Sequence, residues 1–483
     1  MAKGVDVQKF VIFGTGSGGK KVFDYIANFK TVQVQCFLDN FPKAEKFCEL
    51  PVIRANDFLS EGNAKEYIYI IASTYRDEIT KQLLYSKIPS KNIWSKADIV
   101  CYNWIQYKES ITISNISQNE KEKIVLDCGG GFILGGVERW SYNLSRKMLG
   151  CGRDVLLISN KSNTFPPEDL VNYSKHAKIV DDFWNYDFGY VQEMVDILMD
   201  NLPCTVFAAH VNVLLIAASL IKERYPEAIK VVSVVHGGLH SILRDNVAMA
   251  DYVDYILCVS VDARKALVCQ YHVDEKKVLF KETPTEVVDI IDRTYHTKSE
   301  HPLRIAYATR LEKTHKHAEL VMPLVEELEK RKMIYVLDIA GEGSLYENIN
   351  EYITQHNLQN KVRLLGRVPY HEMTKFWMSH DVAINLSECE GCAMAMVESM
   401  AVGTVPIFTN VFSTKHFIHD GVNGYVTDYG NITQMADKLE YLDKNRNVLP
   451  SMGNAAWKEI RTKCQMDDYY TYLNDCVLGG YDE

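Results

Sequence analysis

Residues 387–398 read Ser-Glu-Cys-Glu-Gly-Cys-Ala-Met-Ala-Met-Val-Glu, and they predict a loop that turns into a helix. The apolar run 382–386 before them is typical of a buried strand, and Gly403 after them ends the helix. We expect Glu390 on the loop and Glu398 inside the helix, about two turns further along. Strand, loop and helix in this order form the repeating unit of α/β folds.

The start of this helix suits a phosphate group, because backbone N–H groups point out of a helix N-terminus and the helix dipole favours negative charge there. The candidate residues are Gly391, Cys392, Ala393 and Met394. An isolated pair of glutamates at this spacing is more often a cap and a solvated helix residue, so the carboxylates alone assign no function. The Cys-x-x-Cys at 389–392 has no second pair nearby, and we expect no metal there.

A longer sequence pattern around the two glutamates indicates a function for them. The run Ser387, Glu390-Gly391, Glu398, Met400-Ala401, Gly403 and Pro406-Ile407 is similar to the donor-site signature of retaining GT-B glycosyltransferases of the GT4 type, also called glycosyl transferase group 1. The resemblance implies that Glu390 binds hydroxyls of the donor sugar and Glu398 the ribose, while the amides of 391–394 hold the diphosphate. The family commonly has Gly-Phe-Gly after the first glutamate, where this chain has Gly391-Cys392-Ala393.

Length and composition limit the function classes. A chain of 483 residues is too long for one core and predicts two to four domains. The formal charge of −10 excludes nucleic acid as a partner and strong adhesion to anionic lipid. The longest apolar run, near residues 213–220, is too short to span a membrane, and twelve scattered cysteines indicate reduced thiols. We predict a cytoplasmic protein with at most peripheral contact at the inner face of the membrane. The sequence does not exclude an oligomer.

The N-terminal segment has the pattern of a dinucleotide fold. Residues 8–14 form a predicted strand that enters a glycine loop and a helix, and a second strand, 32–38, ends on an acid. Glycines let the backbone approach a phosphate, and the acid accepts ribose hydroxyls. The candidate nucleotide-binding residues are Gly14, Gly16, Ser17, Gly18, Gly19, Asp39 and Asn40. The segment resembles the N-terminal domain of bacterial sugar acyltransferases, although the His that commonly follows the glycines there is absent here. A purely structural or regulatory module is the alternative.

A second α/β start follows a polar stretch, 99–120, which we interpret as a linker. Strand 123–128 leads into a glycine-rich loop, with Gly129–Gly131 and the pair Gly135-Gly136, and then into a helix over 137–149. In the resembling family, the counterpart of this pair lies against the donor diphosphate at the helix N-terminus.

His236 closes the apolar strand 231–235, where open α/β sheets place their ligands. The resemblance implies that this His touches the hydroxymethyl group of the donor sugar and lines the reaction centre. His210 and His240 are weaker candidates for the acceptor side. A polar stretch at 295–302 is the predicted hinge between the two halves.

The last domain supplies the remaining donor contacts. Arg310 and Lys316 follow a predicted strand, and the resemblance implies that they clamp the diphosphate, whose charge grows as the glycosidic bond breaks. In the resembling family, the counterpart of the loop Gly366, Arg367 and Val368 contacts the base through main-chain groups. A terminal helix within 457–478 is expected to cross back to the first half.

Together these patterns predict an α/β protein of the GT-B class, with two facing Rossmann-like domains preceded by a smaller one. The predicted boundaries are 1–98, the linker 99–120, 121–298 for the acceptor domain and 299–483 for the donor domain. The resemblance implies a retaining, metal-independent transfer of a sugar from a nucleotide diphosphate sugar, most simply a UDP-sugar, with no cofactor. The acceptor is a glycan, a lipid-linked molecule or a protein, in bacterial cell-surface glycan or glycoprotein synthesis.

Two observations bear on metals and on rival functions. No Asp-x-Asp occurs, the pair with which metal-dependent transferases hold a divalent ion on the diphosphate. The alternatives are an NAD-dependent nucleotide-sugar oxidoreductase or epimerase acting at 14–19, and a non-catalytic nucleotide-sugar binding module. Short-chain oxidoreductases carry a Tyr-x3-Lys pair, which this chain lacks.

Overall fold

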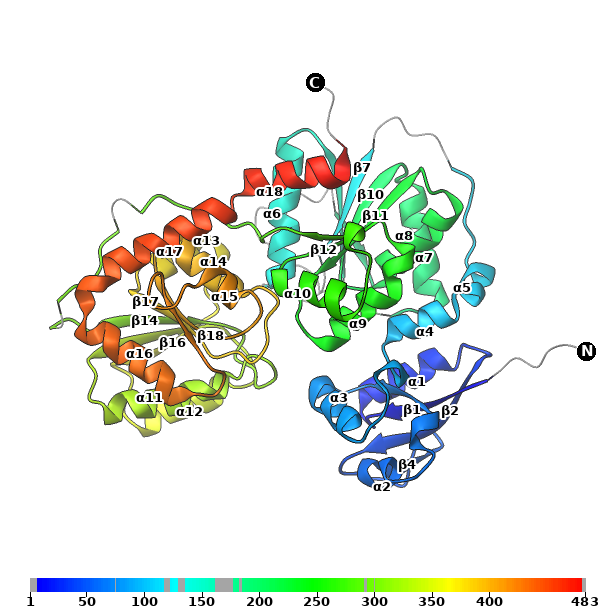
Figure 1. Cartoon of the computed structure of the whole chain (residues 1–483), viewed down its shortest axis with the longest axis horizontal. Coiled ribbons are helices and arrows are strands. Elements are labelled where there is room, and N and C mark those ends of the chain that lie inside the picture. The colour runs from blue at the N-terminus through cyan, green and yellow to red at the C-terminus, as the bar shows by residue number, and fades with distance from the viewer. Residues whose placement is uncertain are drawn as a thin grey trace, which may run out of the picture.

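The computed structural model describes residues 7–73, 75–116, 122–128, 135–160, 177–181, 185–290, 293–298 and 300–479. Within them the strands form three separate sheets, in agreement with the predicted α/β class and with an additional N-terminal domain. Figure 1 shows the third domain, in yellow to red, beside the second, in cyan to green, with the blue N-terminal domain packed below the second.

The N-terminal domain is a six-stranded sheet of order β3-β4-β2-β1-β5-β6, parallel except for the β3–β4 pair. Its first helix lies tight against the sheet, since a Cβ on Gly19 would stand 2.2 Å from the carbonyl oxygen of Gly14. The elements are β1 Gln8–Phe13, α1 Ser17–Ile26, β2 Val32–Asp39, β3 Lys46–Phe47, β4 Leu50–Arg54, α2 Ala55–Leu59, β5 Ile68–Ile71, α3 Arg76–Tyr85 and β6 Ile93–Trp94.

The second domain is a seven-stranded parallel sheet of order β13-β12-β11-β10-β7-β8-β9. Its strands are almost continuously apolar because helices cover both faces. The elements are β7 Lys123–Asp127, α6 Gly136–Gly150, β8 Asp154–Asn160, β9 Ala177–Val180, α7 Phe188–Met199, β10 Cys204–Ala209, α8 Val213–Arg224, β11 Ile229–Val235, α9 His240–Met249, β12 Tyr255–Cys258, α10 Val261–Lys265 and β13 Val278–Phe280.

The third domain is a six-stranded parallel sheet of order β16-β15-β14-β17-β18-β19, the strand order of Rossmann folds. The elements are β14 Leu303–Ala308, α11 Val321–Lys330, β15 Tyr335–Ala340, α12 Tyr346–Gln355, β16 Val362–Gly366, α13 Tyr370–Met378, β17 Val382–Asn385, α14 Met394–Ala401, β18 Val405–Thr409, α15 Thr414–Phe417, β19 Tyr425–Thr427, α16 Ile432–Lys444 and α17 Leu449–Lys463.

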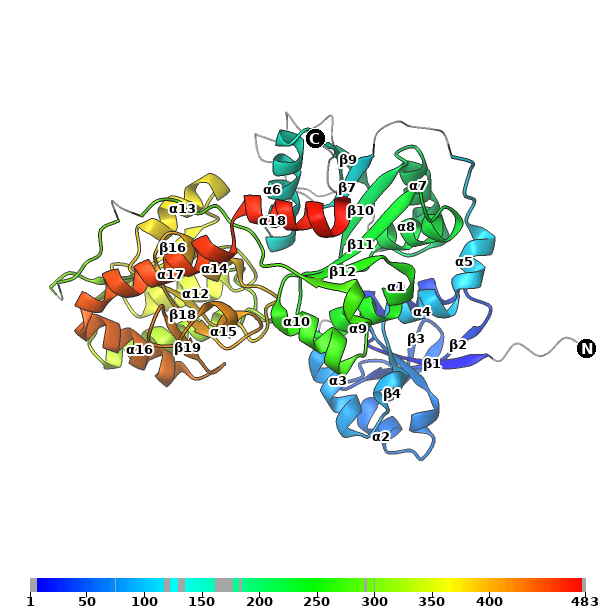
Figure 2. The same ribbon diagram turned by 45° about the horizontal axis from the view of Figure 1, so that its top comes forward.

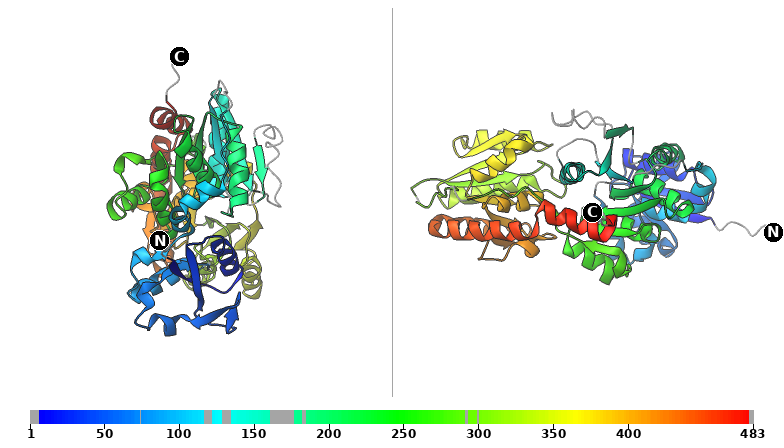
Figure 3. Two further views of the ribbon diagram at one scale, coloured as in Figure 1. Left: turned by 90° about the vertical axis from the view of Figure 1, so that its right-hand side faces the viewer. Right: turned by 90° about the horizontal axis from the view of Figure 1, so that it is seen from above.

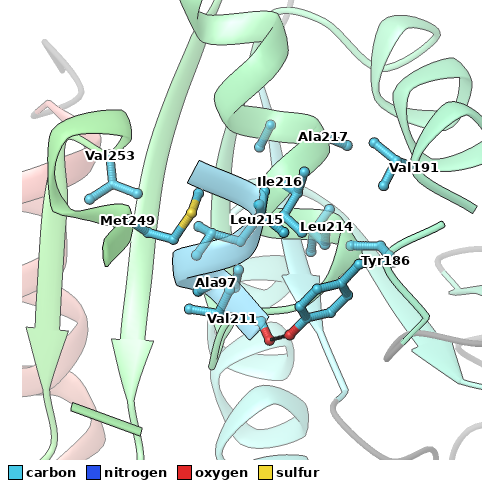
Figure 4. Close-up of a cluster of buried hydrophobic side chains, with 14 of the residues drawn as sticks. Ala97, Tyr186, Val191, Val211, Leu214, Leu215, Ile216, Ala217, Met249 and Val253 are labelled. Carbon is cyan, nitrogen blue, oxygen red and sulfur yellow. Dashed lines mark hydrogen bonds between the residues drawn. The ribbon is translucent and has the colours of Figure 1, made fainter. Parts of the chain in front are cut away.

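The stretch interpreted as a polar linker, 99–120, differs from that expectation in its first half. Two helices, α4 Lys96–Tyr102 and α5 Trp104–Ser110, occupy it, and residues 117–120 lie outside the described residues. The physical reason is an apolar stripe at helical spacing, with Val100, Trp104 and Tyr107 all buried. Figure 4 shows Ala97 of α4 among the apolar side chains of the second domain.

The end of the chain crosses back to the second domain, as the sequence predicted. After α17, the helix α18 (Met466–Leu473) packs on α6, and Figures 2 and 3 show this red segment bridging the two domains. Buried Trp140 donates a hydrogen bond from Nε1 to the hydroxyl of Tyr469 at 2.8 Å. No helix in the described part of the chain is long and apolar enough to cross a membrane.

Candidate functional site

Two predicted site residues of the third domain, Lys316 and Glu390, follow the carboxyl ends of two adjacent parallel strands, β14 and β17. The ammonium group of Lys316, after β14, donates to Glu390 Oε1, after β17, at 2.5 Å. Ser387 donates to the same carboxylate oxygen at 2.8 Å. The side chains of Lys316 and Glu390 are 20% and 13% exposed, so the pair is largely shielded from solvent but still reachable by a ligand.

The loop that carries Lys316 has an uncommon backbone conformation. His315 and His317 have φ angles of +63° and +47°, the left-handed region that side chains rarely adopt. The amide of Glu388 donates to the His315 carbonyl at 2.9 Å, which ties this loop to the loop of Glu390. Strained backbone of this kind persists where the surroundings fix it and is concentrated at ligand sites.

Two helix N-termini approach each other across the space between the second and third domains. A Cβ on Gly136, the first residue of α6, would lie 3.3 Å from Met394 Cγ at the start of α14. Gly391 lies closer still to the second domain, because a Cβ there would stand 2.0 Å from the carbonyl oxygen of His236. The helix starts at Met394, so Gly391 and Cys392 belong to the preceding loop. This meeting of two positive helix ends favours an anion.

His236 lies at the end of β11, beside Trp140 and His210, with ring centroids 5.0 and 5.7 Å away. Burial lowers the pKa of His236 well below its usual range and that of His210 to about 4, so both imidazoles are neutral at physiological pH. Among the described residues, His236 Nε2 and His210 Nδ1 are buried without a hydrogen-bond partner. Buried polar atoms without a partner are uncommon, and a bound ligand or water would satisfy them.

Glu398 lies inside α14, as predicted, and its carboxylate forms an ion pair with Arg139 of α6. Trp377 Nε1 also donates to Glu398 Oε2 at 3.4 Å. The guanidinium of Arg139 stacks on the ring of Tyr370, 4.0 Å from its centroid, and burial lowers the pKa of Arg139 to about 10. Glu398 therefore has a partner from the opposite domain at the position where a ribose is expected.

The other predicted donor residues occupy strand ends without forming one cluster. Arg310 follows β14, is exposed and forms no ion pair or side-chain hydrogen bond among the described residues. Gly366, with φ +65°, ends β16, and Arg367 and Val368 follow it. Gly135 precedes α6, whereas Gly129–Gly131 lie outside the described residues.

Burial raises the pKa of the Cys392 thiol to about 12, which disfavours its reactive thiolate form. All twelve cysteines are free of disulfides.

The N-terminal glycine loop faces a cavity of about 1200 Å³. Its lining includes all but one of the predicted nucleotide-binding residues: Gly14, Gly16, Ser17, Gly18, Asp39 and Asn40. Gly19 instead packs on the backbone of Gly14. The carboxylate of Asp39 accepts hydrogen bonds from Thr15 Oγ1 at 2.6 Å and from the amide of Phe41 at 2.9 Å.

Sequence reasoning missed three further side chains: Arg139 and Tyr370 beside Glu398, and Asp245 on α9. Arg139 is one turn into the helix after Gly135-Gly136, and this position was the available signal. Tyr370 follows Pro369 at the start of α13, next to the predicted base loop. Asp245 on α9 has no recognisable pattern, since a lone Asp inside an amphipathic helix is ordinarily solvated.

Comparisons with known proteins agree with this architecture. Residues 290–459, which cover most of the third domain, match the family model described as "Glycosyl transferases group 1". The N-acetyl-alpha-D-glucosaminyl L-malate synthase of Bacillus anthracis is 22% identical over 340 residues, 65% of this chain and 81% of that protein. The poly(ribitol-phosphate) alpha-N-acetylglucosaminyltransferase of Staphylococcus aureus is 29% identical over 149 residues, 31% of this chain and 30% of that protein.

Solved structures show the same fold. A glycosyltransferase from Rickettsia africae matches with a TM-score of 0.59 and 15% identity, over 74% of this chain and 99% of its own. The Anabaena protein HepE, solved in complex with UDP, matches with a TM-score of 0.58 and 12% identity, over 74% and 99% of the two chains. The second and third domains thus form a GT-B fold, and the N-terminal Rossmann-like domain is additional to it. Within that fold, the third domain is the part that resembles the group 1 glycosyltransferases in sequence.

Proposed function

We propose that the protein is a glycosyltransferase that moves a sugar from a UDP-sugar to an acceptor, with retention of the anomeric configuration and without a metal ion. This proposal rests on three structural features that lie close together. The N-termini of α6 and α14 face each other, the Lys316–Glu390 pair lies on the loops beside them, and His236 closes the strand opposite.

The donor diphosphate lies across the two helix N-termini, against Gly135 and Gly136 on one side and residues 391–394 on the other. Main-chain N–H groups and the helix dipoles stabilise its charge. Lys316 and Arg310 neutralise the additional charge that develops on the leaving phosphate. Arg310 is available for this role because its guanidinium has no ion pair among the described residues.

Glu390 accepts hydrogen bonds from hydroxyls of the donor sugar while Lys316 and Ser387 fix its carboxylate. Neutral His236 hydrogen-bonds the sugar's hydroxymethyl group through the nitrogen that lacks a partner. The main chain of Gly366, Arg367 and Val368 contacts the base. Glu398 binds the ribose, which requires Arg139 to leave that carboxylate when the donor enters.

The reaction proceeds by front-face attack of an acceptor hydroxyl on the anomeric carbon. The bond from that carbon to the phosphate oxygen breaks, the bond to the acceptor oxygen forms on the same face, and UDP leaves with the acceptor's proton. No protein nucleophile takes part, so the carboxylate of Glu390 positions the donor and does not bond to it.

The relatives suggest the donor and the biological setting. Two of them are named as N-acetylglucosaminyl-transferring enzymes, and one fold neighbour was solved with UDP. UDP-N-acetylglucosamine is therefore the first donor to test, with a glycan, a lipid-linked molecule or a protein as acceptor in bacterial cell-surface synthesis. We place the reaction in the cytoplasm, at the inner face of the membrane where the acceptor is lipid-linked.

The test is substitution of the central ion pair. Glu390→Ala and Lys316→Ala should each lower kcat/KM for UDP-sugar turnover by about a hundredfold to a thousandfold, the effect of removing one group that stabilises transition-state charge. Glu388→Ala and Lys313→Ala are matched controls two and three residues away, and they should retain activity. Unaltered turnover in either of the first two variants, with an unchanged melting temperature, rejects the proposal.

A further inference from the structure

The carboxyl ends of all three sheets open toward one region of the molecule. The glycine loop after β1 and Ser73 after β5 line the cavity of the N-terminal domain. The same cavity is lined by Leu239 and Ser241 of the second domain and by Thr314 and His315 of the third. Ligands of open α/β sheets bind at the carboxyl ends of strands, so a ligand here would touch every domain.

A second cavity of about 370 Å³ continues the first one toward the proposed reaction centre. The two share Val22, Arg76, Lys96, Ser241 and Ile242 in their walls. The smaller cavity lies between the N-terminal domain and α9, and His210 is in its wall. The ring of His210 is 5.7 Å from that of His236, so this wall lies beside the residue proposed to contact the donor sugar.

Cationic side chains gather in this connected space. Lys21 lines the larger cavity, and Arg76 and Lys96 stand in the wall common to both. The guanidinium of Arg76 is exposed and donates no hydrogen bond among the described residues. Three carboxylates line the same space, those of Asp39, Glu78 and Asp245. Asp39 accepts hydrogen bonds from Thr15 and the Phe41 amide, and Asp245 interacts with Ser95 and with the guanidinium of Arg76.

Two buried side-chain atoms in the wall of the smaller cavity have no hydrogen-bond partner among the described residues. These are Nδ1 of His210 and Oδ1 of Asp245, both of which belong to residues lining the smaller cavity. Trp94 and Tyr186 add aromatic surface to the same wall. A neutral imidazole, a carboxylate and aromatic rings together suit a hydroxylated ring or chain, which satisfies polar atoms and packs on aromatic faces.

We propose that the N-terminal domain is an acceptor-binding domain, and that the acceptor carries an anionic group, a phosphate or a carboxylate, held by Lys21, Arg76 and Lys96. The inference rests on the proposed transferase function, because the hydroxylated part of the acceptor then extends past Asp245 and His210 to the donor sugar. The additional domain supplies half of the acceptor site, and the GT-B domains alone leave it incomplete.

The decisive experiment titrates inorganic pyrophosphate into the full-length protein at saturating UDP, followed by calorimetry. With the donor site filled by UDP, pyrophosphate should still bind, and Lys21→Ala and Arg76→Ala should each weaken this binding at least tenfold. Lys20→Ala is the matched control, since Lys20 is adjacent on α1 but pairs with Asp24 outside the cavity. No binding at millimolar pyrophosphate, or equal losses in Lys20→Ala and Lys21→Ala, overturns the proposal.

A kinetic arm tests the acceptor role itself. Pyrophosphate in the cavity should slow the hydrolysis of UDP-N-acetylglucosamine without competing with the donor, since water reaches the sugar from the acceptor side, and Arg76→Ala should relieve the inhibition. Inhibition that is purely competitive with the donor contradicts the assignment. If UDP does not bind but pyrophosphate binds in an Arg76-dependent manner, the transferase function falls and the anion site stands.

Two further probes identify the source of the anion. Glycerol 3-phosphate should bind in an Arg76-dependent manner where glycerol does not. Co-sedimentation with phosphatidylcholine vesicles, with and without phosphatidylglycerol, shows whether a lipid headgroup takes the same place. Arg76-dependent binding to the anionic vesicles assigns a lipid-borne acceptor, and binding of glycerol 3-phosphate alone assigns a soluble phosphate ester. Equal binding of glycerol and glycerol 3-phosphate contradicts a site that recognises the negative charge of the phosphate.

Discussion

The second domain meets its two neighbours in different ways. Toward the N-terminal domain, one continuous apolar cluster runs across the boundary, from Phe10 in β1 to Val278 in β13. Buried tyrosines join it, since the hydroxyls of Tyr25 and Tyr107 are 3.0 Å apart and Tyr107 donates to the carbonyl of Tyr186 at 2.5 Å. This boundary resembles the interior of a single domain.

Toward the third domain, polar contacts stand beside a few apolar ones. Arg139 pairs with Glu398, Asn143 donates to the hydroxyl of Tyr370 at 3.4 Å, and the Ser413 amide donates to Asp262 at 2.9 Å. Apart from α18, Phe412 and Cys392, which pack against clusters of the second domain, the buried apolar residues of the third domain form clusters of their own. Boundaries of this kind permit relative motion, as the entry and release of a donor require. We propose that the N-terminal and second domains move as one unit and that the third domain moves relative to them.

The largest expected effect breaks the fixed boundary. Trp104, 7% exposed, stacks on Tyr252 with centroids 4.3 Å apart and donates to Glu223 at 2.7 Å. Trp104→Ala should lower the free energy of unfolding by about 3–5 kcal/mol, the range for deleting a buried tryptophan. Ile105→Ala, at an adjacent residue that is 72% exposed, should change it by less than about 0.5 kcal/mol in denaturant titrations. Similar losses in both variants contradict a shared core.

A smaller effect on the free energy of unfolding is expected from the titration of His210, in the wall of the smaller cavity. Burial lowers the pKa of His210 to about 4, whereas the unfolded chain titrates near pH 6.5, so the unfolded state binds the additional proton between these values. Stability is therefore present above about pH 6.5 and lost as pH falls toward 4, by about 2 kcal/mol between pH 7 and pH 5.

The variant His210→Asn isolates this contribution, since asparagine tolerates the φ of +67° at this position. Burial raises the pKa of Asp245 to about 6, so this carboxyl destabilises the fold as pH rises, opposite to His210. Because Asp245 is present in both the wild type and the variant, its contribution cancels when the two are compared. Thermal melts at pH 7 and pH 5 should show a smaller acid shift in the variant. An equal shift rejects the neutral, buried state of His210.

The crossing segment should have an intermediate effect of about 1–2 kcal/mol. Tyr469→Phe removes the acceptor of the buried Trp140 N–H and leaves that donor without its partner. Tyr470→Phe is the neighbouring control. The Tyr470 hydroxyl accepts only a long hydrogen bond, 3.5 Å from Arg153 Nε, so its loss should lower the free energy of unfolding by less. Denaturation monitored by tryptophan fluorescence measures both, and equal stability of Tyr469→Phe and the wild type would contradict the role of this hydrogen bond.

The smallest expected effect concerns the direct contact between the N-terminal and third domains. Lys81 Nζ and Glu388 Oε1 are 3.9 Å apart, with side chains 73% and 37% exposed. Exposed pairs of this kind contribute little, so Lys81→Ala should change the free energy of unfolding by less than about 0.5 kcal/mol. A loss above 1 kcal/mol would mean that the first and third domains are also fixed to each other.

Local patterns predicted most of the fold and which candidate residues follow the ends of strands. The glycine loops, the helix after 391 and the strand before His236 follow from residue type and spacing. The pairing of Lys316 with Glu390 joins two loops that are adjacent only because β14 and β17 are neighbours in the sheet. The sequence indicated both residues as donor contacts but not their contact with each other.

The domain boundaries are where sequence reasoning was weakest. The polar residues of 99–110 concealed the buried stripe of α4 and α5, because Trp104 and Tyr107 have partners only in the folded second domain. Arg139 and Asp245 are ordinary helix residues until another domain faces them. Contacts between distant segments leave no local periodicity, so such side chains can be recognised only after the domains are placed.

The most direct test of the proposed transferase activity is UDP release from a panel of UDP-sugars incubated with the full-length protein, with NAD(H) binding measured in parallel. We expect one UDP-sugar to bind and to be slowly hydrolysed to UDP, Lys316→Ala to abolish this hydrolysis, and the melting temperature to rise with the donor concentration. Binding of NAD(H) alone, with no UDP-sugar turned over, would contradict it and return the function to an oxidoreductase or a binding module.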